Sequence, residues 1–367
     1  SCYESQVDVD VWVQKWVARL NKSGLQIEAI CLTIEPPGPM LIWSDLDFKW
    51  KTGDKKLFAL YHNILEIIAG YDVFINWNGI NIHPEFLQLL STFNVYSCFD
   101  DPESSEILSK PVARYYDLCL VGNIAELETY KSWGVKNVEF WPLGYFEGER
   151  DKTITEEQIQ SNERDVDVAL VCERESQWRK DRLDQFTTSF PQGSYYGRGW
   201  AQGFLDEADK LPLYKRTKIG PNFHNSTGPI NFRTYMLPAN GVMLLCDNKS
   251  YLAKLYKLGE EAVGFDTVEE TVELCKYYLK NDTERKRIAV NGWRRSIRDY
   301  NEVASFQLGL SSIKKYYNKK CSQTEQGVFR KFNSYKLIGK FKYMFFGFAV
   351  ELYQKVKRFL KRKIEKL

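Results

Sequence analysis

The feature that most constrains the fold is an alternation of short apolar runs with helix-like stretches, which occurs in two blocks. In the first block the apolar runs are 29–34, 73–75, 95–99, 118–121 and 138–141, and the helix-like stretches are 9–21, 56–69, 84–92 and 124–133. The second block has runs at 166–171, 194–196, 218–221, 242–246 and 262–265, with helices expected over 268–280 and 283–300. Strands separated by helices indicate parallel sheets covered on both faces.

This pattern predicts an α/β protein of two Rossmann-like domains. The stretch 146–164 is polar, highly charged and poor in large apolar clusters. We therefore expect a first domain over 1–150, a linker over 151–165 and a second domain over 166–315. With 367 residues, 44% of them hydrophobic, the chain is long enough to bury two cores.

Charge is distributed unevenly along the chain. From residue 334 onward ten Lys or Arg stand against two Glu, so this segment carries +8 and the remainder −5, from a net charge of +3. An acidic body with a basic end is atypical of nucleic-acid binders, in which a basic stripe crosses the folded domain. It is typical of a protein whose end contacts an anionic surface.

The eight cysteines are scattered and form no C-x-x-C motif. Most of them lie in or beside the apolar runs, where a free cysteine behaves as a small buried hydrophobe. This favours a reducing cytoplasm over a disulfide or zinc framework. No signal peptide is recognisable, so we expect a cytoplasmic protein.

The second block carries a series of motifs in a fixed order. The segment 230–247 reads INFRTYMLPANGVMLLCD, and it is followed by LGEEAVGFD at 258–266, the acidic VEET at 268–271, YYL at 277–279 and ERKRIAVNG at 284–292. Over about residues 193–300 this order resembles the C-terminal domain of the CgeB-like (spore maturation protein type) family of GT-B glycosyltransferases, which is GT4-like. The first block is similar more weakly, through FDDP at 99–102, YDL at 116–118 and WPLG at 141–144.

The resemblance implies a GT-B fold and sugar transfer from a nucleotide-sugar to a glycan or lipid-linked acceptor hydroxyl, without a metal or another cofactor. Without a metal, cationic side chains and helix N-terminal amides must stabilise the leaving diphosphate. Arg233 and Lys218 are the leading candidates. The other donor-site candidates are Arg198, His224, Gly228, Asn231, Tyr235, Glu260 and Glu261.

One position departs from the family pattern. Family members usually carry a Glu after the aromatic residue of this motif, where it holds the donor ribose, but this chain has Met236 after Tyr235. Either Glu260 or Glu261 takes that role, or donor binding is altered. The alternative function is therefore a non-catalytic glycan- or partner-binding protein on a degenerate GT-B scaffold.

The sequence Asp100-Asp101-Pro102 ends a predicted strand of the first half. A carboxylate there could act as base on the acceptor hydroxyl, and Asp100 is favoured over Asp101. The competing interpretation is a helix start, with Asp101 as N-cap. The D-x-D at Asp45 and Asp47 is the metal motif of the other large glycosyltransferase fold, and two Rossmann-like halves argue against a metal site there.

The C-terminal segment 334–367 has apolar residues at three- and four-residue steps among many Lys and Arg. Its longest uncharged run, 343–350, is too short to span a bilayer. We expect a basic amphipathic helix on the anionic inner face of the cell membrane, which makes the protein peripheral. The alternative is a helix packed on the body of the protein or on a second copy of it. The expected membrane residues are Lys340, Phe341, Phe345, Phe348, Lys357, Arg358, Phe359, Lys361 and Arg362. This location suggests surface polysaccharide or glycolipid assembly, with other assembly enzymes as partners and no role for nucleic acid.

Overall fold

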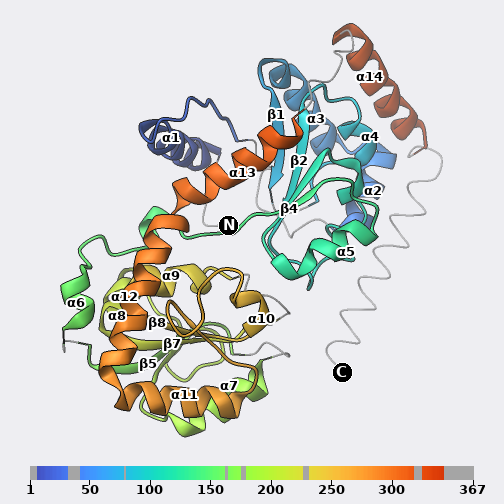
Figure 1. Cartoon of the computed structure of the whole chain (residues 1–367). Coiled ribbons are helices and arrows are strands. Elements are labelled where there is room, and N and C mark those ends of the chain that lie inside the picture. Colours follow the sequence, from blue (N-terminus) through green and yellow to red (C-terminus); the bar gives the residue numbers. More distant parts are fainter. Residues whose placement is uncertain are drawn as a thin grey trace, which may run out of the picture.

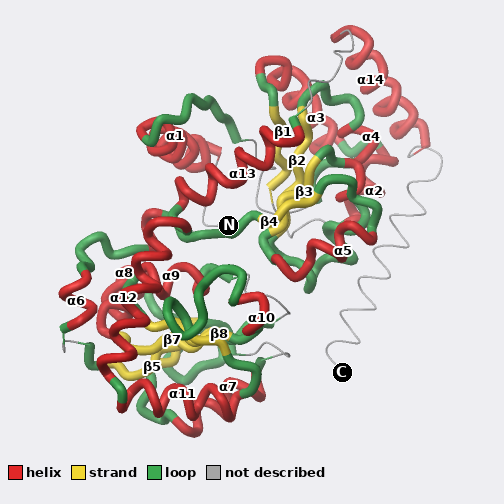
Figure 2. The backbone as a smooth tube through the Cα atoms, viewed as in Figure 1, coloured by secondary structure: helices red, strands yellow, loops and turns green. Residues whose placement is uncertain are grey.

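The computed structural model describes residues 6–31, 42–77, 80–161, 164–174, 179–225, 231–317 and 325–342. Two parallel sheets occupy separate halves of the molecule (Figures 1 and 2). The first has the order β1-β2-β3-β4, with strands Val73–Trp77, Phe93–Cys98, Leu118–Val121 and Val138–Phe140. The second has the order β6-β5-β7-β8-β9, with β5 Val166–Val171, β6 Ser194–Tyr196, β7 Thr217–Asn222, β8 Met243–Cys246 and β9 Val263–Gly264.

Helices cover both faces of each sheet. Those before β5 are α1 Gln6–Lys22, α2 Trp43–Thr52, α3 Lys55–Ile67, α4 Pro84–Leu87, α5 Leu127–Ser132 and α6 Glu156–Gln160, with 3-10 turns η1 Ile68–Gly70, η2 Ala113–Tyr115, η3 Ile124–Glu126 and η4 Glu147–Glu149. Those after β5 are α7 Lys180–Ser189, α8 Glu207–Arg216, α9 Arg233–Ala239, α10 Lys249–Leu252, α11 Val268–Lys280, α12 Asp282–Asp299, α13 Glu302–Tyr316 and α14 Glu325–Lys342. The α/β class with two Rossmann-like domains is thus confirmed.

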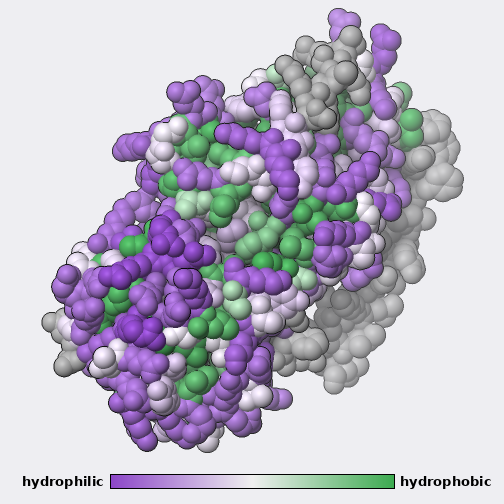
Figure 3. All heavy atoms as spheres, in the orientation of Figure 1, coloured by the Kyte–Doolittle hydropathy of each residue, from purple (hydrophilic) through white to green (hydrophobic). Residues whose placement is uncertain are grey.

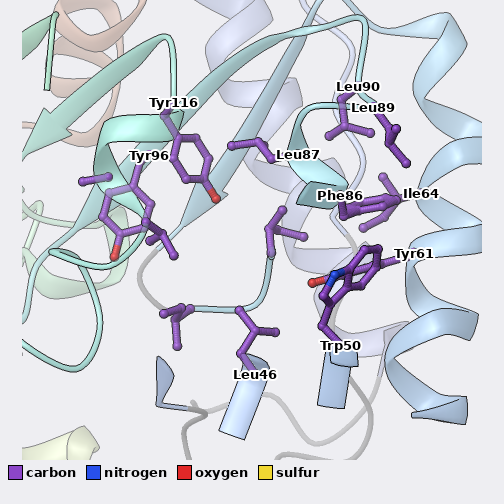
Figure 4. Close-up of a cluster of buried hydrophobic side chains, with 14 of the residues drawn as sticks. Leu46, Trp50, Tyr61, Ile64, Phe86, Leu87, Leu89, Leu90, Tyr96 and Tyr116 are labelled. Carbon is purple, nitrogen blue, oxygen red and sulfur yellow. The ribbon is translucent and has the colours of Figure 1, made fainter. Parts of the chain in front are cut away.

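The first sheet is buried on both faces because its strands alternate between two apolar clusters. Tyr96 and Cys98 of β2 pack into the cluster formed with α2, α3 and α4, part of which is drawn in Figure 4. Phe93 and Val95 of the same strand face the opposite way, toward α1 and α13. Strands buried on both faces read as continuous apolar runs, which is why the sequence predicted β1 to β4. The expected run 29–34 is different: residues 29–31 form no strand, and 32–34 lie outside the described residues.

The second sheet is covered in the same manner. Met243 and Leu245 of β8 pack toward α7 and α11, whereas Leu244 and Cys246 pack toward α9 and Tyr256. Helix α11 begins where the Thr267 hydroxyl accepts the Glu270 amide hydrogen. The parallel pairing brings the carboxyl ends of β5, β7 and β8 to one edge of the sheet.

The predicted linker 151–165 is wrong, because this segment belongs to the second domain. Ile154 and Ile159 are buried in its core, and α6 packs on α12. The Arg164 guanidinium donates to the carbonyls of Tyr214, Thr217 and Asn240, all in the second domain. The segment looked like a linker because α6 is short and its other side chains face solvent.

The chain crosses between the domains twice, at one place. Tyr145 follows β4 and donates its amide hydrogen to the Tyr300 carbonyl at the end of α12, 3.0 Å away. Helix α13 then returns to the first domain, where the Trp141 indole donates to the Ser305 carbonyl at 2.7 Å (Figure 1). Residues 302–315, expected in the second domain, therefore pack on the first.

Helix α14 also packs on the first domain, so the expected tail does not begin as a separate membrane helix. Phe332 is fully buried against Phe58 and Phe86, and Tyr335 contacts Trp50. Lys340 and Phe341 lie in the last turn of α14. The other membrane candidates, Phe345, Phe348, Lys357, Arg358, Phe359, Lys361 and Arg362, lie outside the described residues. None of the described helices is long and apolar enough to cross a bilayer.

Candidate functional site

Polar side chains gather at the carboxyl edge of the second sheet. Strands β5, β7 and β8 end there at Val171, Asn222 and Cys246. In open α/β sheets this edge is where ligands bind. His224 follows β7 and Asp247 follows β8, and both are almost fully buried.

His224 and Asp247 form a buried hydrogen-bonded pair. His224 Nδ1 lies 2.6 Å from Asp247 Oδ1, and the His224 amide donates to Asp247 Oδ2 at 2.9 Å. Arg182 of α7 donates to the same Oδ2 at 3.1 Å. Burial alone would raise the pKa of Asp247, but the His224 and Arg182 contacts outweigh it and leave the pKa below its ordinary value. The carboxylate is therefore ionised at neutral pH.

The other ring nitrogen of His224 supports the start of α9. Because Nδ1 faces a carboxylate, Nε2 accepts from the Thr234 hydroxyl at 3.3 Å and from the Asn231 amide at 3.5 Å. Asn222 donates its side-chain amide to Asn231 Oδ1 and Thr234 Oγ1, at 3.0 and 3.1 Å. The first turn of α9 is thus fixed to the ends of β7 and β8.

Three guanidinium groups converge on this edge, those of Arg179, Arg182 and Arg233, and we call them the arginine cluster. Arg233 donates to Asn222 Oδ1 at 3.0 Å and to the Val171 carbonyl at 3.4 Å. Arg179 donates to the carbonyls of Glu173 and Phe223. Burial lowers the pKa of Arg179, and the neighbouring charges of Arg233 and Arg182 lower it further. Among the described residues, neither Arg179 nor Arg233 forms an ion pair with a carboxylate.

This arrangement suits an anion. These three like charges repel one another, and among the described residues Asp247 forms an ion pair with Arg182, whereas Glu173 acts on Arg179 without forming one. Guanidinium groups match phosphate oxygens in geometry and form strong charge-assisted hydrogen bonds with them. The first turn of α9 begins beside them at Arg233.

The structure brings only part of the predicted donor set to this edge. His224, Asn231 and Arg233 lie at this edge, where Arg233 belongs to the arginine cluster and the other two residues support it. Arg198 lies in the loop after β6 at the same edge, where its guanidinium pairs with Glu173 at 3.3 Å and stays largely exposed. Gly228 lies outside the described residues.

Four other predicted residues lie elsewhere. Lys218 is at the amino end of β7, paired with Asp167 at 2.6 Å. Glu260 and Glu261 precede β9, and their backbone carbonyls face Asn291 and Gly292 of α12. Tyr235 is fully buried beside Tyr300. These four residues do not join the arginine cluster.

Met236 is buried in the apolar cluster beneath α9, together with Leu237 and Tyr256. The chain therefore places no carboxylate at this position. Neither Glu260 nor Glu261 approaches the start of α9 in any described contact, so the idea that one of them replaces the expected acid gains no support.

On the first domain, Asp101 is wrong as a catalytic candidate. It is fully buried, and its Oδ2 accepts from the Tyr130 hydroxyl at 2.5 Å. Burial raises the pKa of Asp101. Residues 101–112 form turns, so the expected helix start is also wrong. Asp100, half-buried after β2, remains at the carboxyl edge of the first sheet.

One group among the described residues has the composition of a metal site: His224, Cys246 and Asp247 place their ligand atoms within 4.8 Å of one another. Burial raises the pKa of the Cys246 thiol well above its ordinary value, so the sulfur stays protonated. Arg182 already contacts the carboxylate. These residues fit a hydrogen-bonded support better than a cation site. Asp47 of the D-x-D pairs with Lys51 at 2.7 Å.

Arg179, Arg182, Asn222 and Asp247 were missing from the predicted site. A signal existed for three of them: the stretch 179–182, which contains Arg179 and Arg182, follows the first predicted strand of the second half, and Asp247 closes another strand. The contact between His224 and Asp247 joins residues of different loops, which spacing along the chain could not reveal.

Comparisons with known proteins agree with this geometry. Residues 158–306 match a family described as glycosyl transferase-like. HepE of Anabaena, solved in complex with UDP, has a TM-score of 0.53 at 11% identity, over 70% of this chain and 82% of that one. Sucrose-phosphate synthase of Thermosynechococcus elongatus scores 0.51 at 13% identity, over 72% and 80%. A glycosyltransferase of Rickettsia africae scores 0.50 at 12% identity, over 85% and 93%. No curated protein sequence matches significantly.

These findings define the fold class: the chain has the GT-B fold, and most of its second domain matches a family described as glycosyl transferase-like. More particularly, the segment that matches the glycosyl transferase-like family contains the whole arginine cluster. The narrower resemblance to the CgeB-like family stays a prediction.

Proposed function

We propose that this protein transfers a sugar from a nucleotide-sugar, with UDP-sugars as the first candidates, to a hydroxyl of a glycan or lipid-linked acceptor. The observation that carries the proposal is the convergence of Arg179, Arg182 and Arg233 at the carboxyl edge of the second sheet. The similar HepE structures hold UDP and UDP-glucose, and for this reason we name UDP-sugars as the first candidate donors. The motif order of residues 230–292 supports the narrower proposal that the chain is related to CgeB-like enzymes.

The chemistry follows from the charges. The acceptor hydroxyl oxygen bonds to the anomeric carbon of the donor sugar, and the bond from that carbon to the β-phosphate oxygen breaks. The hydroxyl proton passes to a carboxylate, for which Asp100 on the first domain is the candidate. The leaving diphosphate gains negative charge, which the guanidinium groups of Arg179, Arg182 and Arg233 stabilise. In this proposal no metal takes part.

His224 and Asp247 act as positioning residues. They hold Asn231 and Thr234, and through Asn222 they fix the Arg233 side chain at the edge of the sheet. A preorganised cation loses little energy to rearrangement as charge develops on the leaving group. Met236 leaves the ribose without the expected acid, so we expect weaker ribose recognition than in family members that carry Glu.

Lipid-linked acceptors would bring the protein to a membrane. We extend the proposal to a cytoplasmic enzyme that docks peripherally through the basic segment 343–367, in polysaccharide or glycolipid assembly beside other enzymes of that process. The body would then be held by α14, which joins this segment to the first domain.

A thermal-shift screen tests the donor proposal. The purified chain is heated with UDP, GDP, ADP, their common sugar conjugates and the corresponding nucleosides, with and without a chelator. We expect one nucleoside diphosphate to raise the melting temperature more than its nucleoside does, and the chelator to leave that shift unchanged. A folded protein that none of these ligands stabilises would favour the non-catalytic alternative.

A further inference from the structure

Aromatic side chains gather at the carboxyl ends of the first sheet. Trp77 ends β1, Phe99 follows β2 and Trp141 follows β4. The Trp77 ring lies 5.9 Å from Phe99, 5.2 Å from Trp141 and 6.4 Å from Trp16 of α1, between ring centroids. Edge-to-face contacts at these distances are favourable. Trp77 is thus held in one orientation by three other rings.

Trp77 nevertheless remains 38% exposed, although Trp16 and Trp141 are 8% and 4% exposed. A single exposed apolar residue is ordinary. This one, however, lies at the edge of a parallel sheet where ligands bind in open α/β folds. It is also braced by buried neighbours, so part of an immobilised indole faces outward.

A series of aromatic rings also connects the surroundings of Trp77 with the second domain. Trp16 stacks on Trp12 at 5.8 Å, Trp12 meets Phe146 at 6.3 Å, and Phe146 lies 5.5 Å from Phe232. Phe232 immediately precedes Arg233 of the arginine cluster. Trp77 and the arginines therefore lie at opposite ends of one aromatic path across the junction of the domains. In the space-filling view the surface is mostly hydrophilic, with apolar patches near this junction (Figure 3).

We propose that Trp77 is the platform of an acceptor subsite that takes a pyranose ring, so that the acceptor ends in a sugar. The inference rests on the proposed function and narrows its acceptor class. A pyranose presents a face of C–H bonds that stacks on a rigid indole, while its hydroxyls need polar partners. The half-buried Asp100 follows Phe99 at the same carboxyl edge of the first sheet, so a carboxylate lies in this part of the domain. The combination of an aromatic face with few polar groups is typical of small-molecule sites.

Saturation-transfer NMR with maltose, cellobiose and N,N′-diacetylchitobiose as probes tests the subsite, on the full chain with and without UDP. The variants are Trp77→Ala and Trp77→Phe, with Tyr277→Ala as control, because Tyr277 is an exposed ring on α11 of the second domain. We expect at least one disaccharide to bind the wild type and the control alike. We expect Trp77→Ala to bind it about tenfold more weakly and Trp77→Phe to retain most of the affinity.

The UDP affinity and the melting curve of each variant are measured as well. They distinguish a failure of the sugar subsite from a failure of the proposed donor site or of folding. Unchanged disaccharide binding in a folded Trp77→Ala protein would overturn the subsite, and so would the absence of binding by all three probes in the wild type. A wild type that binds a disaccharide through Trp77 but no nucleotide would overturn the proposed donor and leave the sugar platform standing.

Discussion

Replacing Asp247 with Asn removes the charge on which the support of the site depends. The carboxylate accepts from the His224 amide at 2.9 Å, from His224 Nδ1 at 2.6 Å, from Arg182 at 3.1 Å and from Asn248 at 3.1 Å. In Asp247→Asn one oxygen becomes an NH2 group, and either orientation of the amide places that group against donors. Breaking a buried ion pair in this way costs about 3–5 kcal/mol.

The expected loss is measurable by thermal unfolding. For a domain of this size about 1 kcal/mol lowers Tm by roughly 2–4 °C, so Asp247→Asn should melt roughly 10 °C lower, as followed by circular dichroism at pH 7. The control is Asp165→Asn, whose exposed carboxylate pairs with Arg216, so this change should leave Tm nearly unaltered. Equal melting temperatures for the two variants would refute the structural role assigned to Asp247.

The pH dependence has a defined sign. Because the folded pKa of Asp247 lies below its unfolded value of about 3.9, its stabilisation is complete above that pH and is lost as the pH falls through the lowered folded pKa. The stability difference between wild type and Asp247→Asn should therefore be present at pH 5 and shrink below about pH 4. A difference that was unchanged as the pH fell from 5 to 2 would contradict the assignment.

Three further changes test the architecture. Phe332→Ala should destabilise the first domain by about 3–5 kcal/mol in urea unfolding, because Phe332 is fully buried. Leu337→Ala, which changes an exposed residue of the same helix, should alter stability by less than about 0.5 kcal/mol. Equal effects of the two changes would contradict the packing of α14. Gly144→Ala should cost about 1–3 kcal/mol in the same assay, since its φ is 65° and an added Cβ would lie 2.6 Å from the Tyr300 carbonyl oxygen; an unchanged midpoint would refute this. Deleting residues 343–367 should release the chain from phosphatidylglycerol vesicles in co-sedimentation, and retention would refute the proposed membrane segment.

Much of the fold follows from the sequence because parallel strands are buried on both faces. Such strands show as short apolar runs, as in 118–121 and 242–246, whatever their neighbours in space. Domain boundaries are harder, since α13 follows α12 in the chain but packs on the first domain. The crossing is marked by contacts between residues far apart in the chain, such as the hydrogen bond from Tyr145 to Tyr300.

The candidate site was partly predictable for a related reason. Arg233 lies within the run of motifs that begins at residue 230, and His224 lies shortly before it in the same region of resemblance, so residue type and position both pointed to them. Arg182 reaches the site from α7, and its partner Asp247 lies 65 residues further along the chain. Lys218 has a suitable charge on a suitable strand, but it stands at the amino end of β7. Sequence distance could not distinguish these cases, because the sheet edge is defined only in three dimensions.

The central claim is that the arginine cluster binds the donor diphosphate, and calorimetric titration with UDP and with uridine tests it most directly. The account predicts that Arg233→Ala binds UDP about 10- to 100-fold more weakly than the wild type, because a charge-assisted hydrogen bond to phosphate is lost. Lys218→Ala, which removes a cation from the other end of β7, should bind UDP like the wild type. UDP affinity that is unchanged in a folded Arg233→Ala protein, or no tighter than that of uridine in the wild type, would contradict the claim.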